Sequence, residues 1–466
     1  MNVFGVEYYR QLLAPIVGER PWLVAMDVLV PAVRYAEQLR SLGASQLMAI
    51  GVSRGVGEIS ETLPFPTVEL GGTQSGGMMM QIRHAEEALS CVDEEVQRQI
   101  DAFDPERQAM VVRSLFSSDR RVGERRVFGG RPASWRRLED KMRVDALWDQ
   151  VGLTRAPRSI VPLDVAALRK SHQSLNQGMG TVWVADNQGG WHGGAKLLRW
   201  VRTASDQREA VAFFTGQCQH IRVMPFLDGI PCSIHGWVFP GETIALRPCE
   251  MLVFRVPGQT SLSYGGAATS WEPPAYIATQ MKEGVIRVGE HLRATVGYRG
   301  SFTVDGVATA DGFLPTELNP RFGAALGRMA GSLPELPLFL LHLATAEGLD
   351  LAYEPRALQR LICEAAAANP VVRAMQVIEG RVSETSIEQF FALEGSVWKP
   401  CLDERAADAR VQVGPASSGT LIFGELKGDR WRAGPSYARE LCGLFEGIER
   451  EMNLGLPPLQ PAPDFR

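Results

Sequence analysis

The 466-residue chain lacks several patterns that mark common classes of protein. Its seven cysteines are scattered without a Cys-x-x-Cys pair, which indicates reduced thiols rather than a disulfide framework. Its seven histidines include no pair with metal-ligand spacing, so we expect no zinc site. No uninterrupted apolar run approaches the roughly 20 residues that span a bilayer, and the first 21 residues do not read as a signal peptide. We therefore expect a cytoplasmic protein that does not contact membranes.

A surplus of basic charge is also missing. The net charge is −5, from 48 Lys and Arg against 53 Asp and Glu, so no nucleic-acid partner is expected. Hydrophobic residues make up 45% and charged residues 22% of the chain, which is ordinary for a globular protein. A chain of this length exceeds what one hydrophobic core supports, and it shows no internal repeat. We expect three or four lobes.

The order of predicted elements divides the chain into four parts. Residues 21–53 read as strand, helix and strand, which begins an open α/β layer in a domain over 1–133. A helix over 134–153 opens a second domain, 134–222, with strands around a glycine-rich loop. Further strands and an apolar helix fill 223–349, and the composition changes near 350. The sequence predicts a mixed α/β and α+β multidomain protein with a C-terminal domain over 350–466.

An acidic hairpin carries the strongest chemical signal. In "PTELNPRFG" (315–323), Glu317, Asn319 and Arg321 alternate along a strand and so share one face. Asp305 lies on the preceding strand, across a turn that contains Asp311, and can face Glu317. Two facing carboxylates repel unless a cation bridges them, and carboxylate and amide oxygens suit Mg²⁺. A solvated hairpin edge is the alternative, and it explains three spaced ligands beside an arginine less well.

Three other segments have both a chemical and a structural interpretation. Lys141, in "EDK" at the start of the predicted helix, opposes the helix dipole unless it reaches a phosphate; otherwise it is an exposed lysine. The loop "NQGGWHGG" (187–194) offers amides that can surround phosphate, or it is a flexible hairpin turn. The stretch "VMPFLDG" (223–229) can enclose an adenine, or it is a buried strand.

The order of these segments resembles the ATP-grasp superfamily over about residues 20–345. The most specific part is "VDGVATADGFLPTELNPRFG", which looks like that family's metal-binding hairpin, and "EDKMRVDALWDQVGLTRAPRSIVPL" looks like the entry into its nucleotide-binding half. The resemblance implies an ATP-grasp fold, in which an α/β lobe precedes two α+β lobes that grip ATP. The domain over 350–466 would be an addition to this fold.

The resemblance also implies roles for individual residues. Lys141 would contact the nucleotide phosphates, and the backbone of Met224 and Leu227 would read the adenine. Arg321 would stabilise charge on the phosphoryl group or hold the substrate carboxylate. The glycines that would form a mobile lid over the phosphates are Gly189, Gly190, Gly193 and Gly194. The Mg²⁺ ligands would be Asp305, Glu317 and Asn319.

The sequence departs from the family pattern at two nucleotide contacts. Ala185 stands where the family has a lysine before the glycine loop, and Lys196 or Arg199 is a candidate substitute. The usual ribose-binding acid after the hinge is missing, and Asp228 is the nearest replacement. Two further residues, Arg247 and Arg255 in "LRPCEMLVFR", are candidates for holding the acyl phosphate or the substrate carboxylate. They read equally well as ordinary strand-edge arginines.

Members of the superfamily activate a carboxylate as an acyl phosphate and pass it to an amine, less often to a thiol or another nucleophile. The resemblance therefore implies an ADP-forming carboxylate–amine ligase that uses ATP and Mg²⁺ on small-molecule substrates. The additional C-terminal domain and divergent first lobe look most like the peptide ligases of antibiotic and other natural-product pathways, of the pheganomycin type. The alternatives are an ATP-grasp enzyme with another nucleophile, a non-catalytic nucleotide-binding protein and a scaffold, and a homodimer is possible.

Overall fold

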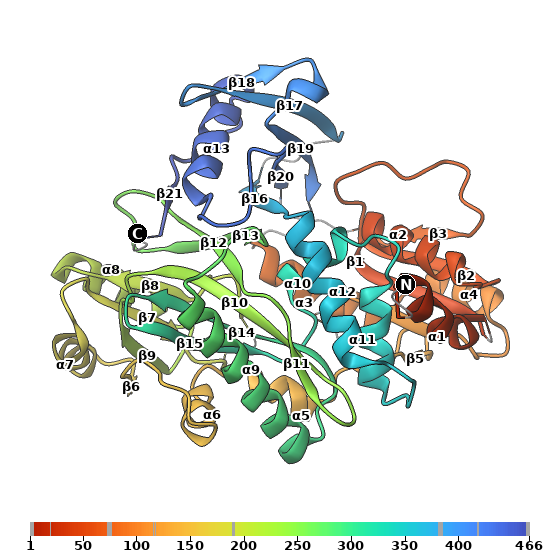
Figure 1. Cartoon of the computed structure of the whole chain (residues 1–466), viewed down its shortest axis with the longest axis horizontal. Coiled ribbons are helices and arrows are strands. Elements are labelled where there is room, and N and C mark those ends of the chain that lie inside the picture. Colours follow the sequence, from red (N-terminus) through yellow and green to blue (C-terminus); the bar gives the residue numbers. More distant parts are fainter. Residues whose placement is uncertain are drawn as a thin grey trace.

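The computed structural model describes residues 4–18, 20–71, 77–114, 116, 118–188, 192–380, 385–416 and 419–462, with the side chains of 77–79 left out. The described chain forms three β-sheets with helices around them (Figure 1). The N-terminal lobe, red to orange in Figure 1, and the yellow-green lobe lie on opposite sides of the molecule, and the blue C-terminal part lies above both.

The N-terminal lobe is an open parallel sheet, as the sequence predicts. Its strands, in spatial order, are β3 (Thr67–Glu69), β2 (Leu47–Ser53), β1 (Trp22–Val28), β4 (Met110–Arg113) and β5 (Arg126–Val127). Its helices are α1 (Val6–Gly18), α2 (Leu29–Ser41), α3 (Gly77–Ser90) and α4 (Glu94–Phe103). Along β1, Trp22 and Val24 belong to one hydrophobic cluster, while Leu23 and Ala25 belong to another. Both faces of this sheet are therefore buried, as is usual for parallel sheets.

A four-stranded antiparallel sheet forms the second lobe. Its strands, in spatial order, are β6 (Ser159–Pro162), β9 (His220–Pro225), β7 (Thr181–Ala185) and β8 (Leu198–Val201). Helices α7 (Val165–Leu175) and α8 (Ala204–Phe214) cover one face, where Leu168 and Phe214 pack against Trp183. The chain leaves this sheet after Pro225 and enters the largest sheet at Ile230. The predicted boundary between 222 and 223 thus falls inside β9, and residues 226–229 form the hinge.

The third sheet runs through the centre of the molecule and into the C-terminal part. Its first half contains, in spatial order, β15 (Gly312–Asn319), β14 (Gly300–Thr309), β10 (Ile230–Val238), β12 (Cys249–Arg255) and β13 (Leu262–Ala268). Its second half continues with β16 (Val372–Glu379), β20 (Gly419–Leu426), β19 (Ala409–Ala416), β17 (Ile387–Glu394) and β18 (Val397–Cys401). Two short strands, β11 (Thr243–Ala245) and β21 (Gln460–Pro461), pair with β10 and β12 respectively.

This sheet is continuous across the predicted boundary at 350. The two halves join where Gly266 of β13 pairs with Ala374 of β16. Gly266 has a φ of +146°, and a Cβ there would lie 2.3 Å from the carbonyl oxygen of Arg373, so only glycine fits. The C-terminal residues therefore extend the central sheet edge to edge, although they also form their own core with α13 (Ala438–Met452).

The remaining helices surround the central sheet. They are α5 (Ala133–Arg136), the 3₁₀-helix η1 (Arg137–Glu139), α6 (Val144–Gln150), α9 (Ala275–Val296), α10 (Ala324–Gly331), α11 (Leu338–Glu347), α12 (Pro355–Ala368) and the 3₁₀-helix η2 (Glu404–Ala406). Residues 338–345 of α11 are all buried, and the helix lies between the N-terminal lobe and the central sheet (Figure 1). The apolar helix predicted in this region is therefore confirmed.

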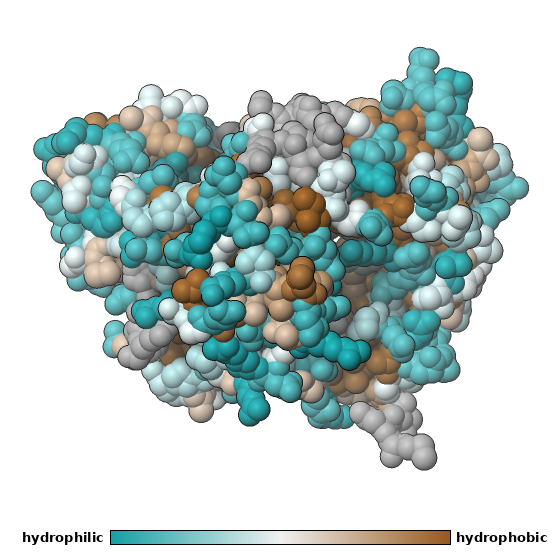
Figure 2. All heavy atoms as spheres, turned by 90° about the horizontal axis from the view of Figure 1, so that it is seen from above, coloured by the Kyte–Doolittle hydropathy of each residue, from teal (hydrophilic) through white to brown (hydrophobic). Residues whose placement is uncertain are grey.

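Surface and thiol chemistry match an ordinary globular chain. All seven cysteines are free. Within the described ranges, no helix is both long and apolar enough to cross a bilayer. On the face shown in Figure 2, hydrophobic residues form small separate groups among hydrophilic ones. The described part of this face lacks the broad apolar area that obligate dimers bury.

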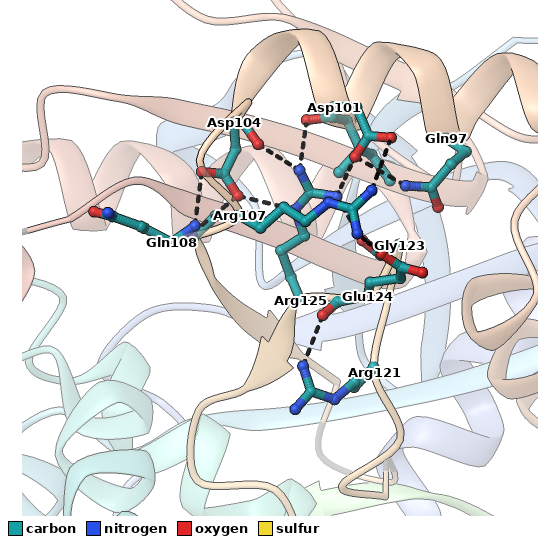
Figure 3. Close-up of polar contacts among 11 residues, drawn as sticks. Gln97, Asp101, Asp104, Arg107, Gln108, Arg121, Gly123, Glu124 and Arg125 are labelled. Atoms are coloured by element: carbon teal, nitrogen blue, oxygen red, sulfur yellow. Dashed lines mark hydrogen bonds and ion pairs between the residues drawn. The ribbon is translucent and has the colours of Figure 1, made fainter.

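A buried arginine organises the edge of the N-terminal lobe (Figure 3). The Arg125 side chain is fully buried, and its Nε lies 2.9 Å from Oδ2 of Asp104, which is also buried. The same guanidinium donates to the carbonyl oxygen of Gly123 at 2.6 Å and pairs with Asp101 at the end of α4. Asp104 in turn accepts hydrogen bonds from the backbone N–H groups of Gln108 and Ala109. The network fixes the connection from α4 to β4 and β5.

Replacing Arg125 should destabilise this lobe strongly. In Arg125→Met the Asp104 carboxylate stays buried without its cation, so we expect the free energy of unfolding to fall by about 3–5 kcal/mol. Urea unfolding followed by circular dichroism measures the change. Arg98→Met is the matched control, because Arg98 is exposed and forms an ion pair with exposed Glu95. Equal stability of the two variants would contradict a structural role for the network.

Candidate active site

The predicted hairpin places two carboxylates face to face. Asp305 of β14 lies directly opposite Glu317 of β15, and Thr303 lies opposite Asn319. Leu318 points to the other face, into the core beneath α9. The turn consists of residues 310 and 311, and Asp311 is exposed there. The predicted facing of Asp305 and Glu317 across the strand ladder is therefore present in the structure.

Hydrogen bonds connect one of these carboxylates to an arginine. Asp305 accepts from Ser233 Oγ of β10 at 2.5 Å and from Asn319 Nδ2 at 2.7 Å. Asn319 Oδ1 accepts from Arg321 Nη2 at 2.7 Å. The Arg321 guanidinium also lies over the Phe116 ring, 4.4 Å from its centroid. The amide of Asn319 thus forms hydrogen bonds with both Asp305 and Arg321, which brings three of the predicted site residues together.

Lys141 neutralises the other carboxylate. Its Nζ lies 3.0 Å from Glu317 Oε1 and donates to the carbonyl oxygen of His192 at the same distance. The lysine is buried although it is charged, so these partners replace its hydration. Lys141 therefore joins the acidic hairpin to the end of the glycine-rich loop.

The helix predicted over 134–153 is wrong, and so is the position of Lys141 in a first helical turn. Helices α5 and η1 end at Glu139, and α6 starts only at Val144. Asp140 accepts a hydrogen bond from the backbone N–H of Met142 at 2.9 Å, a local turn that competes with helix formation. Lys141 lies in this turn, where its side chain is directed by Glu317 rather than by a helix dipole.

Sequence reasoning missed a buried group behind Arg321. Glu139 Oε1 lies 2.7 Å from Arg131 Nη1 and 3.4 Å from Arg321 Nε. Arg131 also donates to the carbonyl oxygen of Phe116. Glu139 is the first residue of the "EDK" segment, but no local pattern pairs it with arginines 8 and 182 positions away. Glu139 and Arg131 thus form a buried ion pair that also contacts Arg321.

Burial and mutual repulsion dominate the electrostatics of the pair. Burial, followed by the charge of Glu317, raises the pKa of Asp305 to about 7, although the Ser233 hydrogen bond lowers it. Burial, followed by the charge of Lys141, lowers the pKa of His192 to about 4, so this imidazole is neutral at pH 7. Its Nε2 lies 3.0 Å from the carbonyl oxygen of Ala185. The site thus has one carboxylate that its surroundings partly protonate.

The negative charge of Asp305 and Glu317 suits a divalent cation, provided that two neighbouring side chains rearrange. Within the described ranges, no three His, Cys, Asp or Glu side chains are placed to hold a metal, so the set is two carboxylates and one amide. Burial, followed by the charge of Glu317, raises the pKa of Asp305, and a bound cation would counter this repulsion. For Asn319 to offer its oxygen beside Asp305, its amide must turn over, and Lys141 must leave Glu317.

The four-stranded sheet revises the expectation at Ala185. The Ala185 side chain is in the core under α7 and α8, together with Trp183. The opposite face of β7 carries Val184, whose partner on β9 is Arg222. A lysine at 185 would point into this core, so Ala185 does not mark a lost ligand on the open face.

A second buried ion pair, which the sequence did not reveal, lies on the face of the four-stranded sheet opposite α7 and α8. Arg222 makes a bidentate contact with Asp145 of α6, at 2.9 and 2.6 Å. Its Nη1 donates to the carbonyl oxygen of Thr316 at 3.3 Å, next to Glu317. Arg158 also reaches Asp145. Strand β9 is thereby fixed to both α6 and the acidic hairpin.

Other predicted residues lie outside this cluster. Lys196 pairs with Glu379 on the exposed surface, and Arg199 lies over the Phe213 ring, so neither reaches the acids. Gly189 and Gly190 fall outside the described residues, whereas Gly193 and Gly194 follow the buried His192 in the described part of the loop. Met224 is buried at the end of β9, Leu227 is half-buried in the hinge and Asp228 is exposed.

The two candidate substrate arginines have structural partners. Arg247 pairs with Glu272 at 3.2 Å, and Arg255 donates through Nε to the carbonyl oxygen of Pro461 at 3.3 Å. For the residues that the structure describes, the hydrogen bonds and ion pairs of these arginines do not include Asp305, Glu317 or Asn319. They read as arginines that tie β12 and its neighbours together.

Solved structures share the fold of this chain. Pyruvate carboxylase from Rhizobium etli gives a TM-score of 0.55 at 15% identity, over 95% of this chain and 39% of that one. The biotin carboxylase domain of 2-oxoglutarate carboxylase from Hydrogenobacter thermophilus was solved with MgADP and bicarbonate. It gives a TM-score of 0.52 at 12% identity, over 88% of this chain and 86% of that one. Phosphoribosylamine–glycine ligase from Thermotoga maritima gives a TM-score of 0.51 at 13% identity, over 95% of this chain and 97% of that one. No protein-family model and no curated protein matches the chain. The chain has the ATP-grasp fold.

The raised pKa of Asp305 predicts a specific pH dependence of stability in metal-free buffer. Between about pH 4 and 7 the folded protein keeps a proton that unfolded Asp305 has released, so this group lowers stability as pH rises. Asp305→Asn removes the effect. We expect its free energy of unfolding, relative to that of the wild type, to increase from pH 4.5 to 8 in urea titrations with EDTA.

The exposed turn acid provides the control for this titration. Asp311→Asn changes the same functional group on the same hairpin, and its stability should run parallel to that of the wild type over the whole pH range. A difference between Asp305→Asn and the wild type that stays constant with pH would show that the fold does not raise the pKa of Asp305.

Proposed function

We propose that the protein is an ADP-forming ligase that joins a substrate carboxylate to an amine through an acyl phosphate. The observation that carries the proposal is the Asp305–Glu317 pair, with Lys141 and Arg321 on either side, on an ATP-grasp fold. One similar structure contains MgADP, and another is named as a ligase of an amine and glycine. The first supports ATP and Mg²⁺ as cofactors here, and the second supports an amine as one substrate.

In this proposal Asp305, Glu317 and Asn319 hold Mg²⁺, with the Asn319 amide turned so that its oxygen faces Asp305. The cation would supply positive charge that neutralises the charge developing during transfer. The protein contributes position, because Ser233 orients Asp305 and the strand register fixes Glu317 opposite it. Asp305 would lose its proton when the cation binds, since the carboxylate pair then has its counter-charge.

Two positively charged side chains, Lys141 and Arg321, would contact the phosphoryl group. Lys141 starts from a contact with Glu317 and needs only to exchange this partner for a phosphate oxygen. Arg321 keeps Glu139 behind it, so its remaining N–H groups can face the substrate carboxylate or the phosphoryl oxygens. The backbone carbonyl oxygen of His192 accepts a hydrogen bond from Lys141, and the neutral imidazole adds no charge there.

Gly193 and Gly194, with Gly189 and Gly190, would cover the phosphates and exclude water.

The reaction balances with these groups alone. A carboxylate oxygen attacks the γ-phosphorus, the bond to the β-phosphate oxygen breaks, and ADP leaves. The amine nitrogen then attacks the acyl carbon, inorganic phosphate leaves, and the amine proton passes to solvent. Positioning and electrostatics do most of this work, so no covalent protein intermediate is needed. Adenine would lie at the hinge, against the backbone of Met224 and Leu227, with Asp228 near the ribose.

The finer proposal is a peptide ligase of natural-product biosynthesis, with an amino acid as donor and an amino acid or peptide as acceptor. Its support is the extension of the central sheet beyond β13, which gives this chain more surface beside the site than two ATP-grasp lobes alone. An ATP-grasp enzyme with another nucleophile is the alternative, and amine dependence separates the two. A nucleotide-binding protein or scaffold would show no substrate-dependent ADP formation.

The decisive measurement is Mg²⁺-dependent ADP release against a panel of amino acids and short peptides. We expect release that requires both an acid and an amine, and Glu317→Gln should lower kcat by about 10²–10³-fold because a metal-facing charge is lost. Asp311→Asn is the matched control, since this acid is exposed on the same hairpin, and it should keep wild-type turnover. ADP release that ignores the amine would contradict a carboxylate–amine ligase.

Lys141 provides a separate test of the nucleotide contact. Lys141→Met keeps most of the length of the side chain but removes its charge, so we expect KM for ATP to rise about 10- to 100-fold. Lys170→Met, at an exposed position on α7, is the control and should leave KM unchanged. If Lys141→Met binds ATP normally, the ammonium serves only to neutralise Glu317.

A further inference from the structure

A group of arginines lies where the C-terminal half of the central sheet meets the N-terminal lobe and α10. Arg373 of β16 and Arg410 of β19 both pair in register with Glu425 of the intervening strand β20. Arg328 of α10 and Arg34 of α2 interact electrostatically with Arg373. We name Arg34, Arg328, Arg373 and Arg410 the arginine cluster. It gathers side chains from four segments that are far apart in the sequence.

The cluster holds more positive than negative charge. Glu425 Oε2 lies 3.0 Å from Arg410 Nη2 and 3.8 Å from Arg373 Nη1. Glu388 lies 3.9 Å from Arg410 Nη1. Among the residues that the structure describes, the ion pairs of these four guanidinium groups therefore involve two carboxylates. Burial, followed by the repulsion from Arg328, lowers the pKa of Arg373 to about 10, so these cations oppose one another.

Arg373 has hydrogen-bonding capacity that its neighbours do not use. Its Nε is buried without a hydrogen-bond partner among the described residues, while Nη2 donates to Gln412 at 3.3 Å. The Arg373 guanidinium carbon lies over the Phe423 ring, 4.1 Å from its centroid, and this contact helps to hold the group in place. A fixed, partly unpaired guanidinium is suited to a planar carboxylate, which can take two parallel N–H bonds.

Tyr264 of β13 connects the cluster to the candidate active site. Its phenol is half-buried, and the charges of Arg328, Asp305 and Arg321 all act on it. Strand β13 also pairs with β16 at Ala267 and Arg373. Tyr264 therefore lies on a strand that pairs with the strand of Arg373, and it responds to charges of both the cluster and the acidic hairpin.

We propose that the arginine cluster binds the free carboxylate of the amine substrate, an inference that rests on the proposed ligase function. An amino acid or peptide acceptor carries a carboxylate of its own, and that group must stay away from the γ-phosphate. The carboxylate that reacts has to lie beside Arg321 and the metal ligands. Binding the second carboxylate beyond Tyr264 would present the amine and keep the wrong acid from activation.

Kinetics with an acceptor and its C-terminal amide test the inference. For Arg373→Met and Arg328→Met we expect KM for the acceptor to rise about 10- to 100-fold, with KM for ATP and for the donor acid unchanged. The amide should be a weak acceptor for the wild type by a similar factor and lose nothing further in the variants. Arg450→Met, on an exposed ion pair of α13, is the control and should behave as the wild type. Equal losses for acid and amide would overturn the inference.

A binding measurement separates this inference from the ligase function itself. Calorimetry of the full-length protein with succinate or inorganic phosphate as probe requires no turnover. Succinate binding that weakens in both variants but not in Arg450→Met supports a carboxylate site, even if no acid and amine pair is turned over and the ligase proposal fails. Succinate binding equal in all proteins, or a loss confined to phosphate, overturns it.

Discussion

Two carboxylates forced to face each other are the constraint around which the central part of this protein is built. The register of β14 and β15 sets Asp305 directly opposite Glu317, where like charges repel. The structure answers it in three ways: burial leaves Asp305 a pKa of about 7, Lys141 neutralises Glu317, and Asn319 carries the influence of Arg321 to Asp305. Such an arrangement is stable enough to fold but remains short of positive charge, which suits a site for a cation and phosphates.

The surrounding ion pairs explain how separate segments keep that geometry. Glu139 fixes Arg321 from behind, and Arg222 with Asp145 fixes β9 to the backbone of β15 beside Glu317. Arg222 and Asp145 are both buried, so removing Arg222 would leave a buried carboxylate with less counter-charge, although Arg158 also reaches it. The acidic hairpin is therefore held from the loop before α6, from the four-stranded sheet and from its own strand. Precise placement of this kind is what phosphoryl transfer requires of a protein.

The parts of this site that follow from local sequence were predictable, and the parts that depend on distant contacts were not. The hairpin could be read from alternation and a turn, and its carboxylates face each other as expected. The resemblance assigned Lys141 to the nucleotide phosphates, which stays a prediction, whereas its contact with Glu317 was not foreseen and the helix around it was wrong because Asp140 forms a local turn. Asp145 and Arg222 are 77 residues apart and ordinary in composition, so nothing in either segment marks them as partners. The continuity of the central sheet depends on one glycine, Gly266, whose conformation no pattern indicates.

Charge balance distinguishes two kinds of cation in this protein. Lys141 and Arg321 each have an acid beside them, so they suit a ligand whose own negative charge is shared with a metal. The arginine cluster has fewer acids than guanidinium groups, so it suits a ligand that brings an uncompensated anion. A ligase for amino acids needs both, because one substrate arrives as a metal–nucleotide complex and another as a zwitterion with a spectator carboxylate. The central sheet connects the two groups, because β13 pairs with β16 at Ala267 and Arg373.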